Sequence, residues 1–194
     1  VLVVLGTLFL TNEFNSGMIR STFSAAPRRT DAIVAKIQVI AITTFLTGLI
    51  ATFVSYLVTY PVLHSHHLHI SLSDWETWRV IAGTAAYLML ISLLGLSVGL
   101  IVRNNAGSQA TVLGIIFVLP LVFEILAAVG QTWANTIQTY LPSSAGGALM
   151  SVDGSTLADA ATKTLEWWVG GLWLLGYVVV LTLIGMILVK RRDA

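Results

Sequence analysis

Four histidines lie close together in this 194-residue chain and are its most evident candidates for chemistry. They are His64, His66, His67 and His69, in the string HSHHLH that follows Pro61. Imidazole nitrogens are good ligands for zinc or copper, and an extended strand would place His67 and His69 on the same side. The usual companions of metal-binding histidines, a helical HExxH motif or cysteines, are missing from the sequence. A solvated loop is therefore the favoured interpretation, and a metal site made of His66, His67 and His69 is the alternative.

Glu124 is the sole acidic residue inside a predicted membrane-crossing segment. A carboxylate in hydrocarbon is costly unless it meets a partner or water, which makes it by default a candidate for function. It follows Pro120 by a single helical turn, where loosened backbone could supply hydrogen bonds. We favour a structural role and keep a gating or substrate-contact role as the alternative. The sequence has no glycine loop ending in GK[ST], so we expect this chain to bind no ATP and no other cofactor.

The segments that would hold these residues are those of a membrane protein. Of all residues 56% are apolar and only 10% are charged, which is typical of membrane proteins. Residues 37–60, 79–102, 109–129 and 167–189 each exceed the roughly 20 residues needed to cross a bilayer. Residues 1–10 are too few to cross, and we interpret them as the end of a transmembrane helix. The sequence thus predicts one all-α transmembrane domain over residues 1–194, with about four complete transmembrane helices plus the end of another, and an outer loop at 130–166.

Lysine and arginine are distributed unevenly about these segments. Only Arg79 and Lys163 fall on one side, and the other eight basic residues fall on the opposite side: Arg20, Arg28, Arg29, Lys36, Arg103, Lys190, Arg191 and Arg192. Basic residues concentrate on the cytoplasmic side of membrane proteins. We therefore expect a multi-pass protein of the cell membrane with a cytoplasmic C-terminus. The formal net charge of +1 gives no case for binding nucleic acid.

Residues 12–36 form the longest polar stretch near the start of the chain, and we call them the elbow. Residues 13–26, placed on a helix, divide into an apolar and a polar half, with Asn15 as the one residue that does not fit. The apolar half holds Phe14, Met18, Ile19, Thr22, Phe23, Ala25 and Ala26, and the polar half holds Glu13, Ser16, Gly17, Arg20, Ser21 and Ser24. Such a segment is expected to lie on a membrane surface or in the groove of a partner. Pro27 ends the predicted helix.

The elbow carries a resemblance to a known family. Its string EFxxGMIRSTFSAAPRR, followed by an apolar helix, resembles the cytoplasmic elbow of type-2 ABC transporter permeases, the membrane subunits of many bacterial exporters. The residues that carry the resemblance are Glu13, Gly17, Ile19, Arg20, Thr22, Pro27, Arg28, Arg29 and Lys36. In that family the segment is a coupling helix that inserts into a cleft of a separate ATPase subunit, and Phe14, Met18 and Phe23 would add its apolar face.

The resemblance implies a permease with six transmembrane helices. The whole first helix and the first half of the second would then precede Val1. It also implies that ATP and Mg²⁺ are bound by the partner ATPase and that the permease pairs with a second copy or a sister subunit. Two other interpretations stay open. One is a membrane protein that binds metal through its histidines, and the other is a membrane anchor or assembly protein that transports nothing, in which the elbow only anchors a loop.

Small residues recur at helical spacing in two neighbouring segments. Gly95 and Gly99 form a GxxxG motif, and Ala110 and Gly114 continue the pattern in the next segment. Such spacing lets two helix backbones approach closely in lipid. Packing within the chain is the favoured use, and a dimer seam is the alternative.

The 130–166 loop contains aromatic and apolar residues at helical spacing. Trp133, Ile137 and Tyr140 repeat on one helical face and stop at Pro142, which predicts a short helix on or in the outer leaflet. The following string YLPSSAGG resembles a segment that folds as re-entrant hairpin helices in type-2 permeases. Its glycine and serine content alone predicts a loop.

Overall fold

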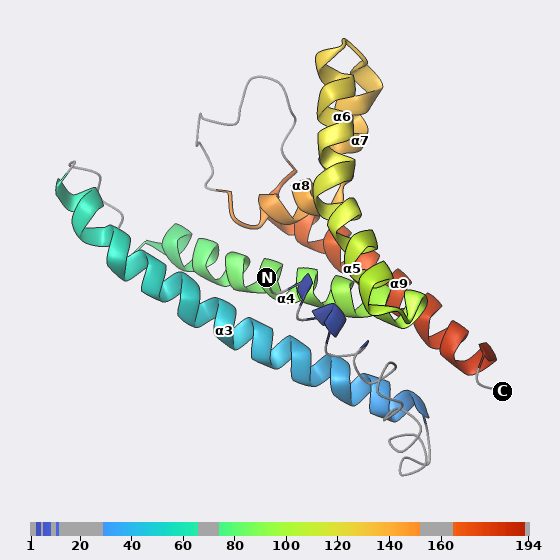
Figure 1. Ribbon diagram of the computed structural model, residues 1–194. Coiled ribbons are helices and arrows are strands. Elements are labelled where there is room, and N and C mark those ends of the chain that lie inside the picture. The colour runs from blue at the N-terminus through green and yellow to red at the C-terminus, as the bar shows by residue number, and fades with distance from the viewer. Residues whose placement is uncertain are drawn as a thin grey trace.

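The computed structural model describes residues 3–4, 6–8, 11, 29–65, 74–151 and 165–192, and these residues form helices joined by short turns (Figure 1). The elements are α3 (Arg29–Ser65), α4 (Trp75–Val102), α5 (Asn105–Leu113), the π-helix η1 (Gly114–Val118), α6 (Leu119–Ala128), α7 (Thr132–Tyr140), α8 (Pro142–Ala148) and α9 (Trp167–Arg192). Four stretches are long and apolar enough to cross a membrane: Ile33–Pro61, Trp75–Val102, Asn105–Ala128 and Trp167–Val189. The prediction of an all-helical chain with four long apolar helices is confirmed within the described residues.

Helix α3 is longer than the predicted segment 37–60 at both ends. It begins at Arg29, so the last part of the predicted elbow is already helical, and it continues through Pro61 to Ser65. Asp31 in its first turn is favourable there because the exposed amides of a helix N-terminus attract negative charge. Proline is tolerated inside membrane helices when the surroundings satisfy the freed carbonyl. The 37 residues of α3 correspond to a length of about 55 Å.

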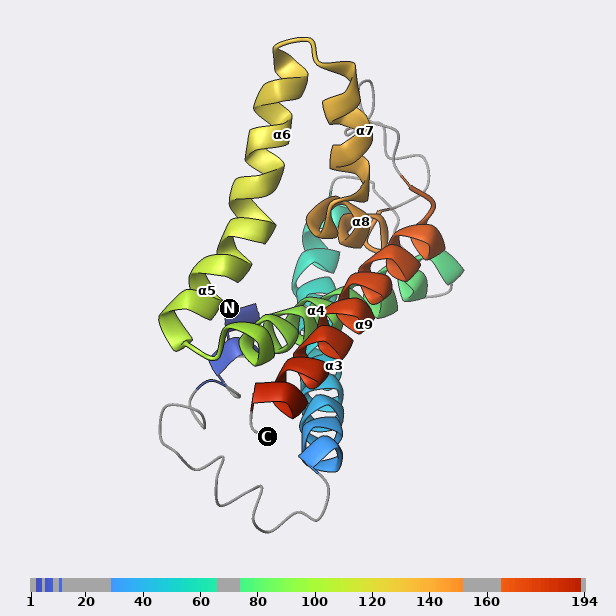
Figure 2. The ribbon, with the colours of Figure 1, turned by 90° about the vertical axis from the view of Figure 1, so that its right-hand side faces the viewer.

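Helix α4 lies at the centre of the bundle. It contacts α3, α5 and α9, and Figure 2 shows it between α3 and α9. Of its membrane-length window 67% is buried, against 17% for the α3 window and 22% for the α9 window. Every residue from Leu90 to Leu100 is buried. Its N-cap is Asp74, whose side chain makes no capping hydrogen bond, so packing rather than capping stabilises this helix.

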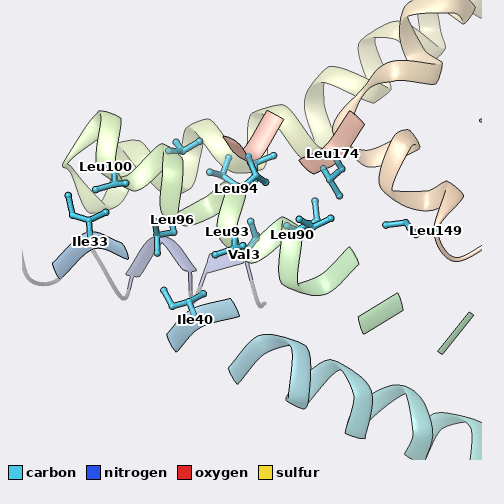
Figure 3. Close-up of a cluster of buried hydrophobic side chains, with 14 of the residues drawn as sticks. Val3, Ile33, Ile40, Leu90, Leu93, Leu94, Leu96, Leu100, Leu149 and Leu174 are labelled. Carbon is cyan, nitrogen blue, oxygen red and sulfur yellow. The ribbon is translucent and has the colours of Figure 1, made fainter. Parts of the chain in front are cut away.

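One hydrophobic core joins α4 to its neighbours (Figure 3). Leu94 and Leu96 are each only 1% exposed and project from α4 into this core. The other buried members labelled in the figure are Val3, Ile33, Ile40, Leu90, Leu93, Leu100, Leu149 and Leu174. The core thus receives residues from α3, from α9, from the C-terminal end of α8 and from the first residues of the chain.

Glycines let the helices approach α4 closely. A Cβ built on Gly48 of α3 would lie 3.1 Å from Ala85 Cα, and one built on Gly185 of α9 would lie 2.8 Å from Leu100 Cβ. Both separations are shorter than ordinary van der Waals contact, so a side chain at either position would push the two helices apart. In lipid, where apolar side chains gain little from leaving the solvent, such close contact supplies much of the packing energy.

The stretch Asn105–Ala128, which combines α5, η1 and α6, leans away from α4 (Figures 1 and 2). We call it the arm. It starts at a tight turn in which Arg103 has a positive φ of 57° and donates its backbone N–H to the Gly99 carbonyl at 2.9 Å. Asn104 then caps α5 by accepting a hydrogen bond from the Gly107 amide at 3.4 Å. Only 6% of the membrane-length window of the arm is buried.

The sequence predicted a regular helix over residues 109–129, and the structure adds a π turn at its centre. The Leu119 amide donates to the Gly114 carbonyl, five residues back. Pro120 follows in the first turn of α6 and has no amide hydrogen to donate. Wide turns of this kind are frequent at functional sites of helices.

Helices α7 and α8 return from the end of the arm into the bundle. Helix α7 contacts α6, and α8 contacts α9 and η1. Because η1 lies at the middle of the arm, α8 lies beside the middle of the arm rather than at its far end. The helix predicted to end near Tyr140 is confirmed. The loop that composition predicts at residues 143–147 is wrong, since these residues form α8.

Small residues make the position of α8 possible. Gly146 lies directly under the ring of Tyr87, and a Cβ there would collide with it. Gly170 of α9 likewise faces the carbonyl oxygen of Ala145. The glycine content that favours a loop in water therefore serves close helix contact here.

Candidate functional site

The candidate site is the region where the elbow joins the bundle. Its predicted coupling residues Glu13, Phe14, Gly17, Met18, Ile19, Arg20, Thr22, Phe23, Pro27 and Arg28 lie outside the described residues. Arg29 is the first residue of α3. The site is therefore built from two described parts, which we call the elbow flanks. One is made of residues 3–4, 6–8 and 11 before the elbow, and the other is the start of α3, whose residues 29–36 are the last residues of the elbow.

The flank before the elbow is seated on α4. Its described residues are helical, and Gly6 faces the carbonyl oxygen of Ser92 so closely that a Cβ there would collide with it. Gly95 faces Val3 in the same way, with Val3 Cγ2 3.2 Å from the position of a Cβ. Thr7 is fully buried, and its hydroxyl donates to the Val4 carbonyl at 2.7 Å. A hydroxyl satisfied by its own helix can be buried without loss of hydrogen bonding.

Thr11, the last described residue before the elbow, meets the base of the arm. It is fully buried, and its hydroxyl donates to the Thr7 carbonyl at 2.9 Å. The same hydroxyl oxygen lies 3.4 Å from Asn105 Oδ1, and Gln109 Nε2 donates to that Oδ1 at 2.7 Å. We call Thr11, Asn105 and Gln109 the polar joint. It connects positions 94 residues apart in the sequence.

The second flank, the start of α3, packs on the same core. Ile33 is 4% exposed and Ile40 5% exposed, and both belong to the buried cluster that contains Val3 and Leu96 (Figure 3). Figure 2 shows the start of α3 and the end of α9 at the same end of the bundle. The last residues of the elbow, which begin α3, therefore pack on the core near the end of the bundle where α9 ends.

The four small residues predicted to serve helix packing or a dimer seam divide into two pairs. Gly95 and Gly99 are buried in α4, Gly95 against residues 3–7. Ala110 is exposed on the arm, and no atom of the described residues lies within 4 Å of a Cβ built on Gly114. The first pair is used within the chain, and the second pair lies on a surface that the described part of the chain does not cover.

Glu124 lies on the exposed part of α6. Its neighbours Leu121 and Ile125 are each 56% exposed, and Glu124 itself is exposed. The structure does not bring Glu124 together with the elbow flanks or with Gly95 and Gly99. It does place Glu124 on the same arm as Ala110 and Gly114.

Two polar contacts between helices were not foreseen from the sequence. Ser97 of α4 and Thr182 of α9 share a hydrogen bond of 2.7 Å. Arg79, which the sequence suggested only as a charge outside the membrane, is 8% exposed and donates from Nη2 to the Ser151 carbonyl at 3.1 Å. Its guanidinium carbon lies 5.8 Å from the ring centre of Trp167. Tryptophans near an arginine could have suggested the ring contact with Trp167, but no local pattern points to the Ser151 carbonyl.

Metal binding receives no support from the part of the chain that the structure describes, which contains no group of three or more metal-binding side chains. His66, His67 and His69 lie outside it. Comparison of the chain with protein-family models, with curated proteins and with solved structures finds no match. The fold and the site define a helical chain with four membrane-length helices whose elbow flanks are packed onto its central helix.

Proposed function

We propose that this chain is the transmembrane permease subunit of an ABC exporter of the type-2 class, located in the cell membrane with its elbow and C-terminus in the cytoplasm. A separate ATPase subunit binds ATP and Mg²⁺ and supplies the energy. The permease itself is a transport subunit and performs no hydrolysis. The resemblance of the elbow sequence suggests this function, and the packing of its two flanks supports it.

The observation that carries the proposal is the anchoring of both elbow flanks on α4. Gly6 and Gly95 bring residues 3–7 into backbone contact with α4, and Ile33 and Ile40 bury the start of α3 in the same core. Closely packed interiors transmit displacement rather than absorbing it. An elbow that only anchored a loop to the membrane surface would need no such rigid connection at both ends.

In this mechanism the apolar face of the elbow, made of Phe14, Met18, Ile19 and Phe23, sits in the cleft of the ATPase. Arg20, Arg28 and Arg29 contact its acidic rim or lipid headgroups. Closure of the ATPase dimer on nucleotide pushes the elbow, and the attached helices tilt as rigid bodies. The buried Leu90–Leu100 section of α4 moves with both flanks, and the path for the substrate opens between subunits.

A second copy or a sister permease would cover the exposed face of the arm. Ala110 and Gly114 provide the small residues for close approach, and Phe117, which is 66% exposed, lies one turn further along. Glu124 on this arm would face the partner or a water-filled path between the subunits. Both are less costly for a carboxylate than hydrocarbon.

Retention of the ATPase tests the proposal. The chain is co-expressed with an ABC-type ATPase subunit from the same genome, solubilised and purified through a tag on the permease. We expect wild type to retain the ATPase and the Arg20→Glu, Phe23→Asp double variant to lose it by more than about tenfold, because central aromatic and arginine contacts dominate interfaces. Ser21→Ala on the polar face is the matched control and should retain it. Equal retention by the double variant would contradict the proposal.

Labelling tests the orientation independently. The chain has no cysteine, so a single introduced cysteine reports its own side of the membrane. We expect Arg28→Cys to react with a membrane-impermeant maleimide only after the cells are permeabilised, and Thr136→Cys on α7 to react in intact cells. Reaction of Arg28→Cys in intact cells would overturn the assignment of the elbow to the cytoplasm.

A further inference from the structure

We infer that the polar joint of Thr11, Asn105 and Gln109 transfers displacement of the elbow to the arm, so that the arm swings about its buried base. The inference rests on the proposed function only for the source of the displacement. The joint itself is an observed contact between the last described residue before the elbow and the first residue of α5. Asn105 and Gln109 are therefore proposed as positioning residues for the arm.

Thr11, the last described residue before the elbow, is held in a fixed position by burial and by a hydrogen bond. Thr11 is followed at once by the elbow and is fully buried, and its hydroxyl is held by the Thr7 carbonyl. Thr7 belongs to the segment that Gly6 and Gly95 hold against α4. A displacement of the chain at Thr11 therefore acts on Asn105, the first residue of the arm, through the 3.4 Å contact between Thr11 Oγ1 and Asn105 Oδ1.

The burial pattern of the arm defines a pivot. Ser108 is fully buried and Val112 is 1% exposed, whereas η1 and α6 contain no buried residue. At about 1.5 Å per residue, Asn105 lies about 10 Å from Val112 on one side and Ala128 about 24 Å from it on the other. A displacement of about 1 Å at Asn105 therefore moves the far end of the arm by about 2 Å, in the opposite direction.

The swing would reach α8 through η1. Helix α8 contacts η1 on one side and α9 on the other, and its Gly146 lies against Tyr87 of α4. Movement of the arm at η1 consequently changes how α8 sits between the arm and the α4–α9 pair. The polar joint at one end of the bundle is thereby connected to α8, which contacts the middle of the arm.

Distances between two spin labels test the inference. The labels are placed on Val129→Cys at the end of the arm and Ala82→Cys on α4, two exposed positions in a chain without other cysteines. Labelled chains are mixed with an excess of unlabelled chains in nanodiscs, so that distances within one chain are recorded. Thr11→Val and Gln109→Met keep the shape of the joint and remove its polar contacts. Thr111→Val is the matched control, because the Thr111 hydroxyl donates to the Gly107 carbonyl of its own helix at 2.8 Å.

With the ATPase bound, we expect ATP and Mg²⁺ to shift the label distance by about 2 Å or more in wild type and in Thr111→Val. The shift should fall to less than half in Thr11→Val and in Gln109→Met while the ATPase is still retained. An unchanged shift in both joint variants would overturn the inference and leave the proposed function standing.

Should wild type retain no ATPase, the proposed function fails and the nucleotide-free distances decide the inference alone. A distribution broader in Thr11→Val than in Thr111→Val would support a joint that restrains the arm. Identical distributions would overturn it.

Discussion

Replacement of Gly95 by alanine tests the packing of residues 3–7 on α4. A methyl group at Gly95 would lie 2.5 Å from the Val3 carbonyl oxygen, 3.2 Å from Val3 Cγ2 and 3.4 Å from Thr7 Cγ2. The first of these is a backbone atom and cannot rotate away. The helical segment around Val3 would have to move as a whole, and the closely spaced contact between Gly6 and Ser92 would open with it.

The cost of this change can be separated from the effect of alanine on the helix itself. Forcing an extra methyl group into a packed interior costs about 1–3 kcal/mol, and replacing glycine by alanine inside a helix returns about 1 kcal/mol. Gly176→Ala inside α9 receives the same propensity gain without the clash, because no atom of the described residues lies within 4 Å of its Cβ position. We therefore expect Gly95→Ala to be less stable than Gly176→Ala by about 1–3 kcal/mol.

The measurement is reversible unfolding in mixed micelles, driven by increasing SDS and followed by helical circular dichroism. The free energies of unfolding of wild type, Gly95→Ala and Gly176→Ala are compared at one micelle composition. Equal free energies for the two variants would refute the close contact between residues 3–7 and α4, and with it the rigid connection on which the proposed function depends.

Two further changes test the polar contacts between helices by the same unfolding measurement. A double-mutant cycle of Ser97→Ala and Thr182→Val should give a coupling energy of about 0.6 kcal/mol and no more than about 1.7 kcal/mol. Zero coupling would show that the 2.7 Å hydrogen bond between Ser97 and Thr182 adds nothing to stability. Arg79→Met keeps the apolar stem and removes the donor to the Ser151 carbonyl, so the free energy of unfolding should fall by about 1–3 kcal/mol. Arg191→Met, at an exposed position of α9, is the control and should stay within about 0.5 kcal/mol of wild type. A loss for Arg79→Met no larger than that of the control would contradict the role assigned to Arg79.

The number and approximate positions of the long helices could be predicted because the length of each apolar segment can be counted in the sequence. The sequence did not predict which of these helices lies at the centre of the bundle. Leu46 of α3 is 51% exposed and Leu94 of α4 is 1% exposed, yet both are leucines in long, predominantly apolar segments. Lipid-facing and protein-facing positions then share one composition, and no apolar stripe marks the buried face.

The candidate site was only partly predictable for a related reason. The GxxxG spacing indicated close approach at Gly95, but its partner Val3 belongs to a segment whose position depends on the tertiary fold. The contact between Thr11 and Asn105 spans 94 positions, beyond the reach of any local pattern. The error at residues 143–147 arose because glycine and serine preferences are learned from water-exposed turns, whereas Gly146 packs against an aromatic ring.

The length of α3 makes the thickness of the lipid bilayer a mechanical variable for this protein. The apolar stretch of α3 has 29 residues, or about 44 Å, while that of α9 has 23 residues, or about 34 Å, against a hydrocarbon layer of about 30 Å. Helix α9 is nearly matched to the layer, but α3 must tilt or deform the lipid around it. Thicker membranes would draw α3 upright while leaving α9 almost unmoved, so the composition of the host membrane would itself adjust the angle between the two helices that enclose α4.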